Sequence, residues 1–210
     1  MPFFPGIIVR EYKLIKAFSN VVRSGKKLVK QKSFTLWITQ VALLTTLCVV
    51  GRIFFAFIPN VQPVTTIIAI VTILLGFKDG VIVSSLTMLV SNLILGMGPW
   101  VVLQIISYLI VVIFVYFSNR LLEKMVKSDY ILFGSRAVVT GIAGILFGFS
   151  ISWLWTFLIQ VENFWVYYLN GLPFDLAHSA GNVVFFILLF PLLNKLFQRY
   201  AVNYQGLKQN

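Results

Sequence analysis

The sequence predicts an all-α integral membrane protein, with six transmembrane helices in a compact bundle and both termini in the cytoplasm. Of its 210 residues 59% are hydrophobic and only 11% are charged, against roughly 45–50% and about 25% in a typical soluble domain. Six apolar segments and a one-sided distribution of basic residues are the other two observations. At roughly 20 residues per span, the chain has room for this bundle and none for an added soluble catalytic domain.

Residues 1–33 are expected to form a basic cytoplasmic N-terminal arm. They contain eight Lys or Arg residues, and the apolar run that follows is too long for the core of a signal peptide. Their stretch FSNVVRSGKKLVKQK mixes basic and apolar side chains. Such a segment can lie on the anionic inner leaflet or remain a solvated tail, and the sequence leaves both open.

Residues 34–198 are expected to form the six-helix membrane domain, and residues 199–210 a cytoplasmic C-terminal tail. Glycines in GFKDG (76–80) indicate a turn, and Pro59, Pro63, Pro99 and Pro173 are interpreted as marking helix ends. The apolar segments lie near 34–58, 63–77, 80–97, 100–121, 131–159 and 174–197.

The basic residues test this topology independently. If the N-terminus is inside, the second and fourth connections and the C-terminus are cytoplasmic, and Lys and Arg gather there. The three outer connections, IPNVQP, GMGPW and VENFWVYYLNGLP, contain neither. This is the positive-inside pattern. It accounts for the formal net charge of +11, so nucleic acid is not expected as a partner.

Arg52 falls inside the first span, toward its outer half. An arginine at bilayer depth costs roughly 2.5–3.5 kcal/mol on insertion scales, so it should face the bundle interior and a partner. Asp175 and Glu162 are the acidic residues expected on the outer side, and Asp175 is the preferred partner. The alternative is that Arg52 extends to the interface without an acidic partner.

Amide, aromatic and charged residues concentrate in the outer half of the predicted bundle. A cavity with a few placed polar groups is typical of a small-molecule site, although an interfacial aromatic belt accounts equally well for any single Trp or Tyr. We expect the following residues to bind a substrate: Arg52, Asn60, Gln62, Asn92, Trp100, Gln104, Trp165, Tyr168, Asp175, His178 and Asn182.

Asp175, His178 and Asn182 are three or four residues apart and therefore share one helical face. A metal site is not expected, because no second histidine and few carboxylates are present to complete a ligand shell. The strongest alternative to ligand binding is a histidine that is buried and hydrogen-bonded between helices. No catalytic residues are expected: Walker A, HExxH, GxSxG and Rossmann motifs are absent.

Cys48 is the one cysteine, so no intramolecular disulfide can form, and we expect it to pack as a small hydrophobic residue.

Ala42 and Thr46 put small side chains four apart on the first span, where a partner helix could approach closely. Packing within the bundle would use the same residues.

Three strings carry a resemblance to a known family: ALLTTLCVVGRIFFAFIPNVQPVT in the first span and loop, SNLILGMGPWVVLQ at the next outer corner, and GLPFDLAHSAGNVVF at the sixth span. Over about residues 38–198 the chain resembles the substrate-binding S component of an energy-coupling factor (ECF) vitamin importer. The pattern GR…PNV.P…SN…GPW.Q…GLPFD..H..GN is most similar to the cobalamin-transporting type.

The resemblance implies a carrier, not an enzyme, in the bacterial plasma membrane. As part of an ECF-type ABC importer, it would take a vitamin, here cobalamin or its precursor cobinamide, from outside into an outward-facing cavity. Its partners would be a membrane scaffold protein and two cytoplasmic ATPases, which use the ATP. No covalently bound cofactor is expected.

The family's AxxxA contact motif for the scaffold corresponds here to Ala42 and Thr46. Thr46 replaces the second alanine of the motif and keeps a small side chain.

Another vitamin, such as pantothenate or riboflavin, is the alternative substrate. An autonomous secondary transporter is a further alternative, for which broken helices or inverted repeats would be expected. An intramembrane enzyme using Asp175 and His178 would need a nucleophile or metal that the pattern does not supply.

Overall fold

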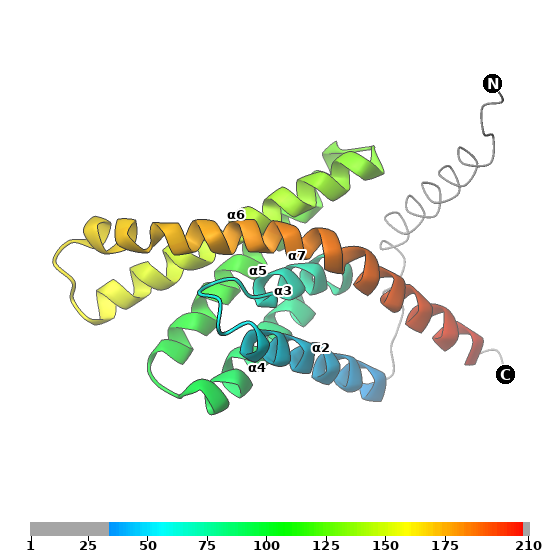
Figure 1. Cartoon of the computed structure of the whole chain (residues 1–210). Helices are drawn as coiled ribbons and strands as arrows, with labels where there is room; N and C mark the ends of the chain where they lie inside the picture. Colours follow the sequence, from blue (N-terminus) through cyan, green and yellow to red (C-terminus); the bar gives the residue numbers. More distant parts are fainter. Residues whose placement is uncertain (1–33, 208–210) are drawn as a thin grey trace, which may run out of the picture.

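The computed structural model describes residues 34–207, and the side chains of residues 34–198. The predicted basic arm at residues 1–33 lies outside this part. Six helices follow one another without a strand in the described part: α2 (Phe34–Phe54), α3 (Val64–Leu75), α4 (Phe77–Leu95), α5 (Trp100–Met125), α6 (Asp129–Leu158) and α7 (Phe164–Leu207) (Figure 1). The predicted all-helical fold is confirmed.

Five of these helices are long and apolar enough to cross a membrane, namely α2, α4, α5, α6 and α7 as far as Gln198. The protein is therefore a multi-pass membrane protein. α3 differs, because it has only 12 residues, which span about 18 Å at 1.5 Å per residue, against a hydrocarbon core of roughly 30 Å. The segment 55–63 and α3 together return the chain between α2 and α4.

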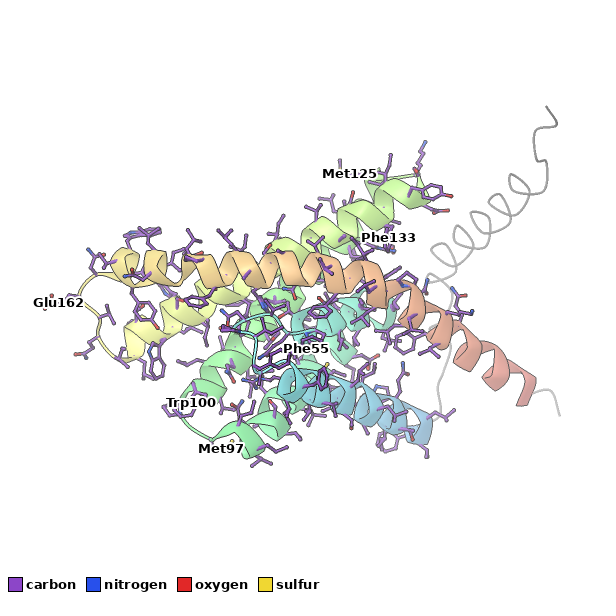
Figure 2. All side chains as sticks on the ribbon, viewed as in Figure 1. Phe55, Met97, Trp100, Met125, Phe133 and Glu162 are labelled. Carbon is purple, nitrogen blue, oxygen red and sulfur yellow. The ribbon has the colours of Figure 1, made fainter. Side chains whose placement is uncertain are left out.

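The helix ends sort into two groups in Figure 1. One group contains the start of α2, the α5–α6 connection and the C-terminal end, and Lys124 and Lys127 belong to it; we call it the inner end. The opposite group contains the connections 55–63, 96–99 and 159–163, which carry no Lys or Arg; we call it the outer end. Figure 2 shows Met97, Trp100 and Glu162 on the side of the bundle away from Met125, with Glu162 apart from the other two.

α3 occupies the centre of the bundle. It contacts α2, α4, α5, α6 and α7, and all its residues except Ile73 and Leu75 are buried. Its isoleucines and valines join three apolar clusters. A helix enclosed by protein on every side can carry threonines at membrane depth, provided that their hydroxyls find hydrogen-bond acceptors.

α7 begins earlier than the sequence analysis predicted. Residues 164–173, expected to form an outer connection, are helical, and Pro173 and Pro191 lie inside the helix. The interpretation of Pro173 as a helix end is therefore wrong. Pro63 and Pro99 do precede helices, as N-caps of α3 and α5, where a missing N–H costs nothing.

Candidate functional site

α6 and α7 form the most extensive helix pair of the described chain, and glycines of α6 make their close approach possible. A Cβ atom at Gly144 would lie 2.5 Å from Nδ2 of Asn182 and 2.9 Å from Cδ2 of His178. One at Gly148 would overlap the carboxylate of Asp175. The three polar residues of α7 thus share one face, as their spacing requires, and that face lies against the glycines.

His178 is buried, and both of its ring nitrogens have protein partners. Nδ1 lies 2.6 Å from the backbone oxygen of Asn60, and Nε2 lies 3.0 Å from Oγ1 of Thr65. Oγ1 of Thr65 lies 3.1 Å from the hydroxyl of Tyr108. The histidine therefore joins α7 to the outer connection, to α3 and to α5.

Asn182 is fully buried one turn farther along α7. Its side-chain oxygen and its backbone oxygen both accept from Oγ1 of Thr66, each at 3.1 Å. The amide nitrogen has no hydrogen-bond partner among the described residues. The Asn182 side chain thus anchors α7 to α3 through its oxygen and keeps an unused donor beside Gly144.

Asp175 is buried as a residue, at 7% exposure, where its carboxylate packs on Gly148. Within residues 34–198, no hydrogen bond or ion pair to this carboxylate is found, and its oxygens are not among the fully buried unsatisfied atoms, so they keep access to solvent. A carboxylate in a largely buried residue loses hydration that protein donors do not replace here. Asp175 therefore remains able to accept hydrogen bonds from a bound molecule.

The predicted pairing of Arg52 with Asp175 is wrong. Arg52 lies in the last turn of α2, and its Nη1 donates to Oγ of Ser91 on α4 at 2.5 Å. Sδ of Met88 lies 3.6 Å from the same nitrogen. Because α3 separates α2 from α7, whose backbones make no direct contact in the described part, the two charges face different neighbours. The helix C-terminus itself favours a cation there.

The amides of α4 and α5 meet near the outer end. Asn92 donates through Nδ2 to Oε1 of Gln104 at 2.8 Å and to the backbone of Met88. The nitrogen of Gln104 keeps no partner within residues 34–198. Trp100 is 38% exposed and lies at the start of α5, against Gly98 (Figure 2).

The remaining predicted residues lie at the outer end without joining one cluster. Asn60 is exposed and Gln62 is half-buried in the first outer connection. Tyr168 is buried and stacks on Phe164, with ring centroids 5.7 Å apart, whereas Trp165 is largely exposed. These last two residues are helical, not in a loop as predicted.

Several residues of this region escaped the sequence analysis. Thr65, Thr66, Ser91 and Tyr108 supply partners that no spacing along one helix could assign, because each acts across helices. The glycines of GIAGILFG (141–148) were detectable, since small residues three and four apart predict close helix packing. No group of three or more possible metal ligands occurs in the described part of the chain.

The comparisons with known proteins give one finding. A family model described as "ECF-type riboflavin transporter, S component" matches residues 32–197. The chain belongs to this family of ECF S components. Members of the family are transporter subunits and not enzymes, and the match confirms the S-component resemblance without distinguishing a cobalamin-transporting type. Neither the search of curated proteins nor that of solved structures found a match.

The glycine contact of this S component can be tested by adding a methyl group. Gly144→Ala should lower the midpoint of thermal unfolding in detergent, because the new Cβ displaces Asn182 and His178, at a cost of about 1–3 kcal/mol. Gly134→Ala is the matched control, since a Cβ there meets nothing within 4 Å. It should be neutral or stabilising by up to about 1 kcal/mol. Equal effects of the two variants would contradict the close packing.

Proposed function

We propose that this S component captures a vitamin from outside the cell at the outer end of its bundle. It then delivers the vitamin inward in a complex with a membrane scaffold protein and two cytoplasmic ATPases, in the bacterial plasma membrane. Membership of the ECF family supports the general role. The observation that carries the location is the set of polar groups at the outer end that the chain leaves unused.

That set contains a charge and several amides. The carboxylate of Asp175 has no partner within residues 34–198, and the side chain of Asn60 faces solvent. Gln62 and Gln104 are half-buried, and so can contact both protein and ligand. Small-molecule sites typically combine a few polar groups with aromatic and aliphatic side chains, and the outer end offers both kinds of side chain.

The first candidate substrate is cobalamin or its precursor cobinamide. The pattern GR…PNV.P…SN…GPW.Q…GLPFD..H..GN supports this choice, and so do the outer amides, because cobalamin carries many peripheral amides that can pair with them. Riboflavin is the second candidate, since the matching family model is described as a riboflavin transporter component.

The proposed contact with the scaffold uses α2. Ala42 and Thr46 are both exposed, and Oγ1 of Thr46 donates to the backbone oxygen of Ala42 at 2.8 Å, which satisfies its hydroxyl within α2. Leu43, Leu47 and Val50 beside them are exposed as well. A smooth apolar surface with small residues four apart suits close packing of a partner helix.

Purified protein in detergent should bind cobalamin or cobinamide with one site per chain, and should not bind riboflavin or pantothenate. Isothermal titration against these four vitamins measures this directly. Binding of riboflavin alone would replace the first candidate with the second. Failure of all four on folded protein would contradict the vitamin assignment.

Asp175→Asn should weaken binding of whichever vitamin is found by roughly tenfold, because hydrogen bonds to a charged acceptor are stronger than those to an amide. The empty protein should become more stable to heat, since a largely buried residue loses a charge that no described protein group pairs with. Glu162→Gln removes an exposed charge at the same end and should change neither quantity. Unchanged affinity in Asp175→Asn would remove this carboxylate from the site.

Ala42→Leu and Thr46→Leu should each abolish most vitamin uptake in cells while leaving vitamin binding intact, because the larger side chain separates α2 from the scaffold. Ala180→Leu, at an exposed position of α7, is the matched control and should retain uptake. Uptake and copurification of the ATPases are the two measurements. Full uptake in both α2 variants would exclude this face as the contact.

A further inference from the structure

A row of hydrogen bonds runs from α5 through the centre of the bundle to the outer connection. The hydroxyl of Tyr108 lies 3.1 Å from Oγ1 of Thr65, which lies 3.0 Å from Nε2 of His178. Nδ1 of His178 lies 2.6 Å from the backbone oxygen of Asn60. Tyr108, Thr65 and His178 are each at most 8% exposed, so water does not compete freely for these bonds.

The chemistry of the groups fixes the direction of each bond. A backbone carbonyl only accepts, so Nδ1 of His178 carries a proton. No acidic group lies within ion-pair distance of His178 in residues 34–198, and a buried imidazolium without a counter-ion would be costly. The neutral ring then accepts at Nε2 from the Thr65 hydroxyl, whose oxygen accepts from Tyr108.

The hydrogen bond from His178 holds Asn60 by its backbone oxygen, while Asn60 itself remains exposed. Its φ of 58° lies in the left-handed region, which asparagine tolerates better than most residues. Two apolar contacts hold the same connection against α7. Phe55 meets Phe185 with ring centroids 5.2 Å apart, and Val61 lies close to Gly181.

We infer that Thr65 and Tyr108 are positioning residues of the vitamin site. Acting through His178, they hold the backbone of Asn60 and thereby orient the amides that connection 55–63 presents to the ligand. Both ring nitrogens of His178 bond to protein groups. Neither nitrogen is therefore free to bind the vitamin or a metal ion within the vitamin. The inference rests on the proposed function and replaces ligand contact as the role of His178.

The single histidine of the chain makes the bonding pattern directly measurable. Protein labelled with [15N]histidine should give one protonated nitrogen, Nδ1, and one unprotonated nitrogen, Nε2, by NMR in detergent, with and without vitamin. This is the less common tautomer of a neutral histidine, so its observation would support the row of bonds. Protonation at Nε2, or a large change in Nε2 on adding vitamin, would overturn it.

Thr65→Val tests the positioning role. It should weaken vitamin binding by roughly 3- to 10-fold, as expected for one lost buried hydrogen bond, and it should shift the Nε2 signal of His178. Thr72→Val is the matched control on α3, because the Thr72 hydroxyl bonds only to the backbone of its own helix at Ile68 among the described residues. Tyr108→Phe should act in the same direction as Thr65→Val, with a smaller effect.

A spin-label pair separates positioning from general destabilisation. Labels at Phe57→Cys and Leu176→Cys, both exposed positions, in a Cys48→Ala background report the distance from the connection to α7. Thr65→Val should broaden this distance distribution in the empty protein, and Thr72→Val should not. Equal distributions in both would overturn the inference even if a vitamin binds. A fixed connection with the expected tautomer, but no vitamin bound, would instead contradict the proposed function.

Discussion

The close contact between α6 and α7 is the constraint on which the site depends. Helices in a bilayer gain little from burying apolar surface against each other, so packing and hydrogen bonds hold them together. Gly144 and Gly148 leave room for the polar face of α7. From there, His178 reaches Thr65 and Asn182 reaches Thr66. Side chains at these two positions of α6 would push α7 outward and break both connections to α3.

α3 connects the α6–α7 contact to the outer end of the bundle through its hydrogen bonds to α7. It is too short to cross a bilayer alone, and the surrounding helices enclose it, so its position is set by its neighbours. At the outer end of α3, Thr65 and Thr66 bond to residues of α7, whereas Thr72 bonds within α3 itself. The polar contacts thus concentrate where connection 55–63 enters α3. Phe55 and Val61 hold this connection against α7, while residues 56–60 are exposed.

Much of the fold could be predicted from the sequence because topology follows from properties of the chain itself. Spans require apolar length, which the sequence shows directly, whereas the inward orientation of the basic connections stays a prediction. The shared face of Asp175 and His178 likewise follows from helical spacing. The partner of Arg52 could not be found this way, because it depends on which helix lies beside α2. Pro173 was misinterpreted because its effect depends on whether neighbouring groups satisfy the freed backbone.

Charged groups are paired in the inner half of the bundle and unpaired in the outer half, and this difference supports the proposed location of vitamin binding. At the inner half, Arg136 pairs with Glu123 at 2.9 Å and bonds to Asn119 at 2.8 Å, and Trp37 donates to Asp79 at 2.7 Å. At the outer half, Asp175 keeps no partner in residues 34–198, and Arg52 bonds only to neutral groups there. Unpaired charges cost free energy in a bilayer, and a bound vitamin with complementary donors and acceptors would recover part of it. The paired charges of the inner half thus stabilise the fold, and the unpaired charges of the outer half support the proposed binding of a vitamin at that end.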